Sequence, residues 1–565
     1  MTPMNRRRFI GWLSTAGLAP LLGPSVLHAA DAETVTDAAL AKAGRLLGLD
    51  FDDAERELMR KSVEEHLESY EKLRELPLGN EVQPALLFSP LLPGASVPAA
   101  GEKKSSPRKR FSKKSLARLL REPAGPAFHS LRELGALLRE GKLSSVELTR
   151  RYLERLKRFD AELHCVITLT EERAMRLARR ADEELARGVD RGPLHGIPWG
   201  AKDLIAARGY RTTWGAMPFK DQVIDLDAAV VEKLDAAGAV LTAKLSVGAL
   251  AWGDVWFGGT TRNPWNTEQG SSGSSAGPAA ATVAGLVGFS VGTETLGSII
   301  SPSQRCGATG LRPTFGRVSR YGTMALSWSM DKLGPICRSV EDCALVLEAI
   351  HGADGRDASA IDAPFVWNAD RDPATLRLGF DREAFEEESP DRPYDQSALR
   401  NLRGMGLTLH PVSLPKLPVG DMLIILDAEA GAAFDDLTRS NRDDQLVRQI
   451  EQAWPNVFRA ARFIPAVEYI QANRARRLLM ERFEAMMREV DVYVHPTYGG
   501  STLLAANLTG HPTVVVPNGF RGDGTPASIS FTGGLFREAE LLAVAKAYQD
   551  RTGYHRSHPP LFSGS

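Results

Sequence analysis

Two serine- and glycine-rich segments of this sequence combine residue types that can carry out acyl transfer. The first, G-S-S-G-S-S-A-G-P, spans residues 270–278, and the second, G-T-E-T-L-G-S-I-I-S-P-S, spans residues 292–303. Glycine and serine let the backbone approach a ligand closely, and consecutive N–H groups in residues 295–298 can converge on an anion. A serine beside such donors is a candidate nucleophile with an oxyanion hole.

A serine nucleophile needs a base, and the sequence contains two candidates. His195 lies in G-P-L-H-G-I-P, which is typical of a turn leading into a strand and favours a structural histidine. Lys202 lies in G-I-P-W-G-A-K-D-L, a tight and otherwise apolar segment. A lysine normally has a pKa of about 10.4, but burial without a carboxylate partner lowers it and favours the neutral amine. Taken alone, Lys202 and Asp203 are more typical of an ion pair at the surface.

Several further motifs accompany these segments, and together they resemble the amidase signature family. The resemblance covers roughly residues 127–555, and the motifs stand in the order and at the spacing that the family has. In chain order they are G-I-P-W-G-A-K-D, R-N-P-W, G-S-S-G-S-S-A-G, G-T-E-T-L-G-S-I, C-G-A-T-G-L-R-P-T-F-G-R-V-S-R-Y-G, D-K-L-G-P-I, S-V-E-D and H-P-T-V-V-V-P.

The resemblance implies a Ser–cisSer–Lys triad. The nucleophile position falls on Ser298, the bridging serine on Ser274 and the lysine on Lys202. Neutral Lys202 would take a proton from Ser274 while Ser274 takes one from Ser298, whose oxygen then attacks the amide carbonyl. Water would hydrolyse the acyl-enzyme. The resemblance also implies a cis peptide bond between Gly273 and Ser274.

The oxyanion hole is expected from backbone N–H groups of the nucleophile turn. Thr295, Leu296 and Gly297 are the expected oxyanion or substrate-binding residues, together with Ser275, which would form hydrogen bonds nearby. The family usually has Asp, Gly and Arg where this chain has Glu294, Leu296 and Ile300. Leu296 still supplies an N–H group. Ile300 removes a charge near the nucleophile, which leaves the substrate open and is also compatible with a catalytically weakened member.

The N-terminus resembles a twin-arginine export signal. M-T-P-M-N-R-R-R-F-I is followed by an apolar stretch, residues 10–27, that glycine and proline interrupt, as in the h-region of a signal peptide. Small residues near Ala30 suit cleavage. We therefore expect a signal peptide over residues 1–32, a transient partner in the twin-arginine export machinery, and a periplasmic or secreted protein. An uncleaved anchor or a misplaced start is the alternative.

The elements that must position these motifs follow from hydrophobic periodicity. Helical patterns alternate with short β-rich runs, which predicts an α/β domain with a buried sheet. The resemblance implies the amidase-signature fold, a large mixed sheet sandwiched by helices, here with an N-terminal helical extension. The predicted helices cover residues 52–74, 146–159 and 171–184, and the predicted strands residues 239–242, 376–380, 490–494 and 513–516.

The same patterns divide the chain into five parts. After the signal peptide we expect a helical extension over residues 33–98 and a basic, proline-containing linker over residues 99–126. The catalytic domain is predicted over residues 127–555, with a C-terminal tail over residues 556–565. Residues 354–395, loop-rich and acidic, are expected to form a surface insertion of the catalytic domain.

Composition excludes several other classes of protein. With 43% hydrophobic and 25% charged residues the chain is globular rather than disordered. The 69 Lys and Arg balance 70 Asp and Glu, so a nucleic-acid partner is not expected. The basic run over residues 103–114 is more typical of a solvated linker than of a nucleic-acid tail. The four cysteines form no CxxC pair and are expected to be buried thiols.

The function that these observations favour is an exported serine amidase that uses neither metal nor cofactor. Its substrate would be a small-molecule or peptide amide. The alternatives are a glutamine-dependent amidotransferase subunit, an esterase that uses the same acyl-enzyme, and a non-catalytic binding protein on this scaffold. The sequence names neither the amide nor the oligomeric state.

Overall fold

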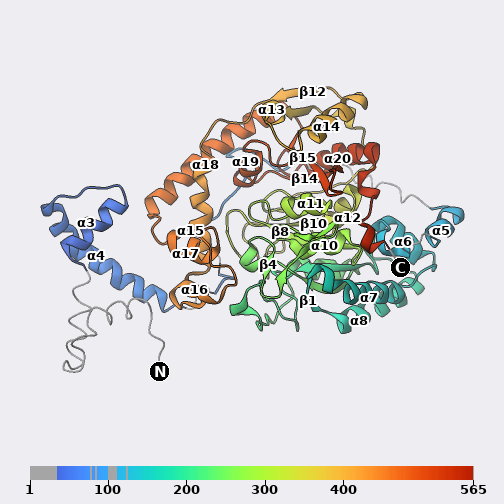
Figure 1. Ribbon diagram of the computed structural model, residues 1–565, viewed down its shortest axis with the longest axis horizontal. Coiled ribbons are helices and arrows are strands. Elements are labelled where there is room, and N and C mark those ends of the chain that lie inside the picture. Colours follow the sequence, from blue (N-terminus) through green and yellow to red (C-terminus); the bar gives the residue numbers. More distant parts are fainter. Residues whose placement is uncertain (1–34, 77–78, 83–85, 99–110, 122–124, 564–565) are drawn as a thin grey trace.

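Eleven strands form one mixed sheet through the centre of the protein (Figure 1). The structure is a computed structural model that describes residues 35–76, 79–82, 86–98, 111–121 and 125–563. The predicted signal peptide lies outside these residues. In order across the sheet the strands are β1 (Val166–Leu169), β3 (Val240–Leu245), β2 (Pro198–Lys202), β8 (Phe289–Glu294), β10 (Lys332–Cys337), β9 (Thr309–Arg312), β14 (Thr513–Phe520), β15 (Pro526–Gly533), β13 (Val492–Pro496), β11 (Leu378–Asp381) and β12 (Leu409–Val412).

The pairing within the sheet is parallel in two places and antiparallel between them. β2 runs parallel to both β3 and β8, and β11 runs parallel to both β12 and β13. The strands from β8 to β13 are joined through antiparallel pairs. Most central strands are buried along their whole length, as strands covered on both faces are. The predicted mixed α/β sheet is confirmed.

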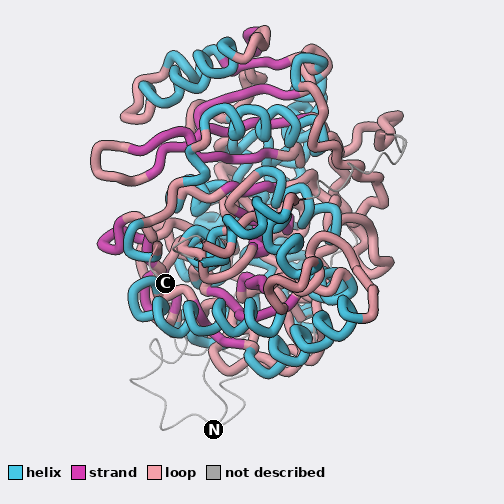
Figure 2. Tube along the Cα trace, turned by 90° about the vertical axis from the view of Figure 1, so that its right-hand side faces the viewer, coloured by secondary structure: helices cyan, strands magenta, loops and turns pink. Residues whose placement is uncertain are grey.

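Helices cover the sheet, which runs between them in Figure 2. α12 and α20 pack together and against β9, β10, β14 and β15, whereas α10 and α11 pack together and against β8, β10, β14 and β15. The helices of the catalytic region are α6 (Leu131–Arg139), α7 (Ser145–Leu163), α8 (Glu171–Ala186), α9 (Ala229–Ala236), α10 (Ala276–Val283), α11 (Ile300–Cys306), α12 (Val340–Ile350), α13 (Arg382–Glu386), α14 (Arg392–Gly404), α15 (Ile424–Ala433), α16 (Asp435–Arg439), α17 (Trp454–Ala461), α18 (Ala466–Met487), α19 (Thr502–Thr509) and α20 (Glu538–Thr552).

Small two-stranded ribbons lie beside the main sheet. β4 (Val255–Trp256) pairs with β5 (Gly259–Thr260), and β6 (Arg262–Asn263) pairs with β7 (Asn266–Gly270). β7 ends at the first serine-glycine segment, so the second ribbon leads the chain directly into it.

The predicted linker and the predicted C-terminal tail are both more structured than expected. Within residues 99–126, Lys113–Leu119 forms the helix α5, and its Leu116 and Leu119 are buried. In the tail, Phe562 is fully buried, and its backbone oxygen accepts a hydrogen bond of 2.6 Å from the guanidinium of Arg155. The linker was predicted from its charge and proline content and the tail from the end of the family resemblance, whereas a few apolar side chains hold each segment on the core.

The prediction of a surface insertion over residues 354–395 is wrong in its central part. Residues 378–381 form strand β11, which lies between β13 and β12 in the sheet. Phe365 and Trp367, in the loop before it, belong to the main hydrophobic core. The strand predicted over residues 376–380 is therefore confirmed as β11, whereas the acidic and loop-rich sequence around it had suggested a surface insertion.

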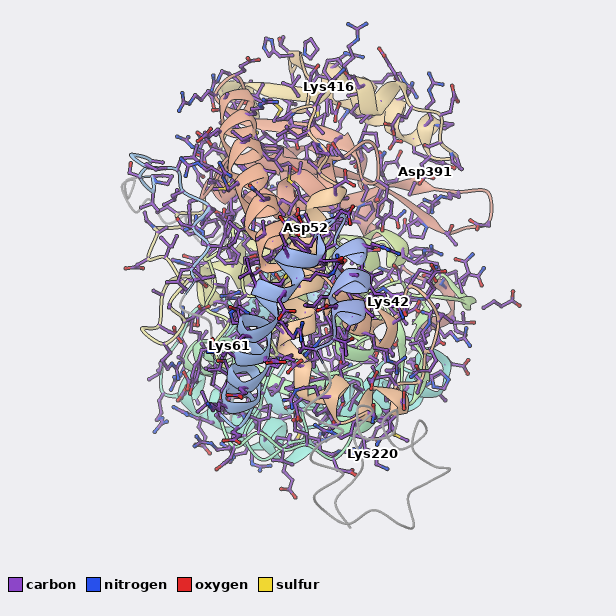
Figure 3. The ribbon with its side chains drawn as sticks, turned by 90° about the vertical axis from the view of Figure 1, so that its left-hand side faces the viewer. Lys42, Asp52, Lys61, Lys220, Asp391 and Lys416 are labelled. Atoms are coloured by element: carbon purple, nitrogen blue, oxygen red, sulfur yellow. The ribbon has the colours of Figure 1, made fainter. Side chains whose placement is uncertain are left out.

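The N-terminal extension forms two helices that pack on each other, α3 (Asp37–Leu46) and α4 (Asp53–Arg74). Asp52 caps α4: its carboxylate accepts the N–H of Glu55, whose side chain accepts the N–H of Asp52. The two helices stand outside the catalytic body on the side of α15–α18 (Figures 1 and 3). Leu58 on α4 is 81% exposed. Among the described helices, none combines the length and hydropathy needed to cross a membrane.

Candidate active site

Lys202 ends β2, the strand between β3 and β8, and its side chain is fully buried. Its Nζ donates to the Oγ of Ser274 at 2.8 Å, to the Oγ1 of Thr293 at 2.8 Å and to the backbone oxygen of Thr293 at 3.2 Å. All three acceptors are uncharged. The amine of Lys202 is therefore oriented by hydrogen bonds without a carboxylate in contact with it.

Burial lowers the pKa of Lys202 well below its ordinary value, and the more distant carboxylates of Asp331 and Glu294 only partly oppose this effect. Asp203, the next residue, is not its partner. Asp203 is also fully buried, and its Oδ1 accepts the amine of Lys244 at 2.6 Å. The interpretation of Lys202 and Asp203 as a surface ion pair is therefore wrong. The neutral amine is the form that such a site favours.

The first serine-glycine segment carries Ser274 to this amine. The peptide bond between Gly273 and Ser274 is cis, as the sequence resemblance implies. A Cβ atom on Gly273 would lie 1.8 Å from the backbone oxygen of Gly253, so only glycine fits here. Ser274 is 1% exposed and also accepts, through its backbone oxygen, the N–H of Gly248 at 3.4 Å.

The second segment forms a turn between β8 and α11. Gly297 has φ +80°, a left-handed conformation that favours glycine. Within the described residues, the backbone N–H groups of residues 295–298 donate no hydrogen bond. Ser298 is 7% exposed, more than Ser274 or Lys202. The turn thus presents a serine at the edge of the buried site beside donors that can hold an anion.

Ser275 holds the two segments together. Its backbone N–H donates to the backbone oxygen of Ser298 at 3.1 Å. Its fully buried hydroxyl donates to the backbone oxygen of Thr293 at 3.0 Å and accepts the N–H of Thr293 at 3.2 Å. Gly292 lies beside it, where a Cβ atom would come within 2.7 Å of the Ser275 Oγ. The structure therefore places Ser275 as a bridge between the loops.

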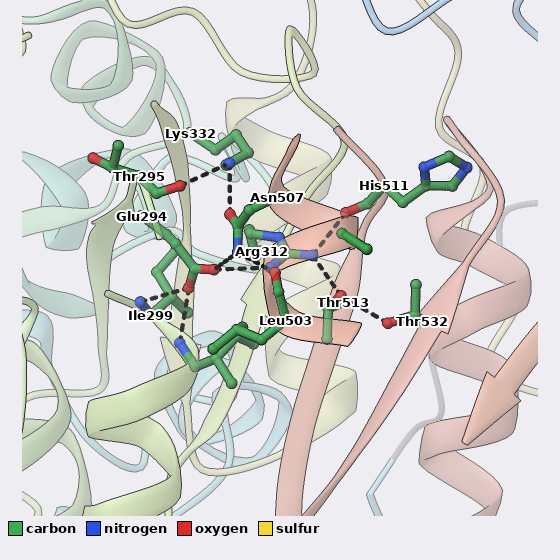
Figure 4. A network of polar contacts seen from close by, with 12 residues as sticks. Glu294, Thr295, Ile299, Arg312, Lys332, Leu503, Asn507, His511, Thr513 and Thr532 are labelled. Atoms are coloured by element: carbon green, nitrogen blue, oxygen red, sulfur yellow. Dashed lines mark hydrogen bonds and ion pairs between the residues drawn. The ribbon is translucent and has the colours of Figure 1, made fainter. Parts of the chain in front are cut away.

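Glu294 organises the nucleophile turn through a buried network (Figure 4). Its Oε2 accepts the N–H groups of Ile299 at 2.8 Å and Ile300 at 3.0 Å. Its Oε1 accepts a guanidinium N–H of Arg312 at 2.8 Å and the side-chain amide of Asn507 at 2.9 Å. The carboxylate thus joins the start of α11 to β9 and α19.

The charge of Glu294 is stabilised by this network. Burial alone would raise its pKa, but the charges of Arg312 and Lys332 and the hydrogen bonds from Arg312 and Ile300 together outweigh that effect, and the pKa is lowered to about 2. Arg312 is itself fully buried and donates further to the backbone oxygen of His511 at 2.9 Å and to Thr513 at 2.6 Å. A carboxylate and a guanidinium with this many partners form a rigid support for the turn.

Asp331 and Lys332 hold Thr295, the first residue of the nucleophile turn. The hydroxyl of Thr295 donates to the Oδ1 of Asp331 at 2.5 Å, and the Oδ2 of Asp331 accepts the N–H of Leu326 at 2.8 Å. The amine of Lys332 donates to the backbone oxygen of Thr295 at 3.3 Å and to the Oδ1 of Asn507 at 2.7 Å. Both oxygen atoms of Thr295 are thus engaged, which fixes the position of this residue at the start of the turn.

Sequence reasoning missed most of these supporting residues. It noted Glu294 and Ile300 as departures from the family pattern, but it assigned no role to Arg312, Asn507 or Lys332. Asn507 lies on α19, more than two hundred residues after Glu294, and no local signal marks it. The motifs G-L-R-P and D-K-L-G-P-I were the only signals for Arg312 and Lys332. Ile300 is fully buried, so its side chain does not reach solvent.

The structural interpretation of His195 is confirmed. His195 is buried, its Nδ1 accepts the N–H of Arg191 at 3.1 Å, and its ring lies beside the carboxylate of Glu184. The four cysteines are buried free thiols, as expected.

Taken together, the arrangement has the parts that acyl transfer needs. An amine whose pKa burial has lowered donates to a serine hydroxyl, and a second serine stands on a turn whose N–H groups are not otherwise engaged. Such a set can activate an oxygen nucleophile and stabilise the charge that forms on a carbonyl oxygen.

Comparisons with known proteins agree with this chemistry. The profile of the amidase family matches residues 147–542. A glutamyl-tRNA(Gln) amidotransferase subunit from Methylococcus capsulatus is 35% identical over 478 residues, which is 76% of this chain and 98% of that protein. The corresponding protein of Chloroflexus aggregans is 36% identical over 472 residues, 75% of this chain and 96% of that one.

Solved structures show the same similarity in three dimensions. The native peptide amidase from Stenotrophomonas maltophilia superimposes with a TM-score of 0.70 and 32% identity, over 78% of this chain and all of that chain (100%). An amidase family protein from Bacillus anthracis superimposes with a TM-score of 0.69 and 25% identity, over 80% and 95%. In each of these comparisons the matched region leaves about a fifth of the present chain unmatched.

Proposed function

The chain belongs to the amidase family, and on that premise we propose that it is a serine amidase that hydrolyses the C–N bond of a linear carboxylic amide. The observation that carries the proposal is the hydrogen bond from the buried amine of Lys202 to Ser274 at 2.8 Å. A lysine without a carboxylate in contact, and with a lowered pKa, can act as a base near neutral pH.

In the proposed reaction, neutral Lys202 accepts the hydroxyl proton of Ser274 as Ser274 accepts that of Ser298. The Oγ of Ser298 forms a bond to the amide carbonyl carbon, and the carbonyl electrons move onto oxygen. The N–H groups of residues 295–298 hold this oxyanion, and losing one such donor typically costs about 2.7–4 kcal/mol. The C–N bond then breaks as the proton returns to the leaving amine.

Deacylation repeats the relay with water. Water loses a proton through Ser274 to Lys202 and attacks the ester carbonyl of the Ser298 acyl-enzyme. The ester C–O bond breaks, the carboxylic acid leaves, and Ser298 regains its proton. The scheme draws every proton from the three side chains and water, and it needs neither a metal nor a cofactor.

A second candidate, a subunit of an amidotransferase, is supported by the names of the relatives at 35% and 36% identity. The resemblance of the first residues to an export signal and the 146 residues before the family match favour the hydrolase instead. We propose accordingly that the protein is exported by the twin-arginine machinery to the periplasm or the medium. Release of ammonia from free glutamine, but not from peptide amides or simple amides, would favour the amidotransferase.

Labelling with a fluorophosphonate probe, read by intact mass between about pH 6 and about pH 10, tests the proposal. One adduct is expected on the wild type and on Ser301→Ala, a neighbouring serine on α11, and none on Ser298→Ala. The labelling rate should rise with pH as Lys202 loses its proton and level off below the ordinary lysine pKa, because burial lowers the pKa of this amine. A folded protein that forms no adduct at any pH would contradict the proposal and favour a binding protein.

A further inference from the structure

A large cavity, about 1440 Å³ in volume, lies between the N-terminal extension and α15–α18. The proposed catalytic steps do not use it. Its size exceeds the roughly 300–1,000 Å³ typical of small-molecule sites. The extension contributes Leu73, Leu76, Leu86 and Leu87 to its wall.

These four leucines are the unusual feature of the cavity. They are 60%, 53%, 75% and 58% exposed, although apolar side chains are normally covered. All four line the same hollow rather than scattering over the surface. A group of exposed apolar side chains around one concave site is typical of a place where an apolar ligand binds.

The segment that carries Leu86 and Leu87 is fastened to the catalytic body on both sides. Before it, the side chain of Asn80 donates to the backbone oxygen of Ala325 at 2.8 Å and accepts its N–H at 2.6 Å. After it, the ring of Phe88 packs edge-on against Phe315 at 5.0 Å. The buried guanidinium of Arg476 lies 3.5 Å from the centre of the Phe88 ring. The N-terminal extension is thus bound to the catalytic body and forms one wall of the cavity.

The opposite wall is built from segments that also build the active site. Trp214 lines the cavity, and its N–H donates at 3.2 Å to the backbone oxygen of Asp203, the residue after Lys202. Leu296, in the nucleophile turn, packs against the hydrophobic cluster that contains Trp214. A ligand in the cavity would therefore lie against Trp214, which contacts the residue next to the base and belongs to the hydrophobic cluster on which Leu296 packs.

Four of the charged side chains that line the cavity are paired with one another. Arg439 pairs with Asp435 at 2.6 Å, and Arg442 pairs with Asp436 at 2.7 Å. The buried Glu429 accepts hydrogen bonds from Ser327, Ser329 and Tyr469. These pairings favour an uncharged apolar occupant over an ionic one.

We propose that this cavity binds a large apolar substituent of the amide substrate, and that the N-terminal extension is a specificity element of the enzyme. The inference rests on the proposed amidase function for the chemistry of the ligand. The concave shape of the cavity favours an apolar substituent of a substrate over a membrane surface, which would need a convex apolar patch.

Isothermal titration with octanamide and acetamide tests the cavity separately from catalysis, because it uses the Ser298→Ala protein, which cannot form the acyl-enzyme. Octanamide should bind at least about tenfold more tightly than acetamide, since its extra methylene groups leave water. Adding Leu86→Ser and Leu87→Ser should remove most of that preference. Leu46→Ser, a matched control on α3 that is 73% exposed and does not line the cavity, should leave it unchanged.

Equal affinities for the two amides, or a preference that Leu86→Ser and Leu87→Ser leave intact, would overturn the inference. So would leucine variants that lose binding to phosphatidylcholine vesicles while keeping the octanamide preference, since the leucines would then serve a membrane. Failure of the proposed function is distinguishable: octanamide would still bind in the cavity, but the wild type would form no fluorophosphonate adduct. An adduct without an octanamide preference would remove only the cavity inference.

Discussion

The amine of Lys202 donates to the hydroxyl of Ser274 over 2.8 Å, although 72 positions separate the two residues in the chain. Lys202 reaches this point because β2 ends there, between two parallel neighbours in the interior of the sheet. Its nearest carboxylate in sequence, Asp203, is taken by Lys244. The carboxylate of Asp203, which could keep Lys202 charged, is thus bound to Lys244. The amine of Lys202 contacts the uncharged hydroxyl of Ser274 instead.

Lys202→Met is predicted to stabilise the protein while it abolishes labelling of Ser298. Between the lowered pKa of the folded protein and pH 10.5, the unfolded lysine binds a proton that the folded protein has lost, because burial lowers the pKa of Lys202. The unfolded state therefore binds more protons, and wild-type stability rises with pH by about 1.4 kcal/mol per unit in this window. Urea unfolding of both proteins at several pH values should show the advantage of the variant shrinking as pH rises towards 10.5. Lys220→Met, at an exposed lysine on the surface (Figure 3), should show no such trend.

Glu294→Gln is predicted to lower the free energy of unfolding and to slow labelling of Ser298. The amide leaves the buried guanidinium of Arg312 without its counter-charge, and breaking a buried pair in this way costs about 3–5 kcal/mol. The loss relative to wild type should shrink as pH falls from 4.5 towards 2, because the pKa of Glu294 is lowered from 4.5 to about 2 and protonation removes the same charge.

Glu538→Gln is the matched control for this prediction. Glu538 pairs with the fully buried Arg317 at 2.5 Å and accepts the N–H of Thr314 at 2.9 Å, and among the described contacts it forms no hydrogen bond with residues 294–300. Its loss should destabilise the protein to a similar extent and leave the labelling rate of the folded protein unchanged. If both variants slow labelling equally, Glu294 has no specific role in positioning the turn.

Gly292→Ala is predicted to slow labelling of Ser298 through Ser275. The added Cβ atom would lie 2.7 Å from the Ser275 Oγ and 2.9 Å from the Cδ1 of Ile336, too close for either to remain in place. Overpacking of this kind costs about 1–3 kcal/mol, and it displaces the residue whose N–H holds the backbone oxygen of Ser298. Gly404→Ala, with no atom within 4 Å of the new Cβ, should leave both the urea midpoint and the labelling rate near wild type.

Phe562→Ala is predicted to destabilise the catalytic domain by about 3–5 kcal/mol, the usual cost of emptying a buried aromatic site. The ring is fully buried and packs edge-on against Phe159 on α7 at 5.0 Å. Leu561→Ala, one residue earlier and 55% exposed, should change the free energy of unfolding by less than about 0.5 kcal/mol. Equal urea midpoints for Phe562→Ala and the wild type would show that residues 556–563 are the loose tail that the sequence suggested.

Short-range features of the sequence predicted most of the local structure. Asp52 caps α4 because its side chain needs only the N–H of Glu55, three residues away. The apolar spacing over residues 146–159 predicts α7, and alternation of helical and β-rich runs predicts the sheet. Glycine at 297 fits the positive φ of its turn. The cap, the helix and the turn depend on contacts within a few residues, so the sequence alone determines them, whereas the order of strands in the sheet depends on distant pairing.

The catalytic motifs were also readable, because each keeps its residues close together in the chain. The family resemblance indicated Lys202, Ser274 and Ser298 as the triad. In the structure the amine of Lys202 donates to the hydroxyl of Ser274, and Ser275 links the loops that carry Ser274 and Ser298. Burial of the lysine could not be read from G-A-K-D, where a surface ion pair was the simpler interpretation. A charged neighbour in sequence is a partner only if the fold leaves it available.

What only the tertiary structure decided is which distant groups meet. Arg312, Asn507 and Glu294 come from three elements far apart in the chain, and their mutual contacts set the charge of the carboxylate. The four leucines of the extension looked like a helix face and a loop, and they line a cavity only because Asn80 and Phe88 dock beside them. The burial of a side chain, its pKa and the shape of a cavity depend on which distant segments pack together, because those segments exclude water from the site.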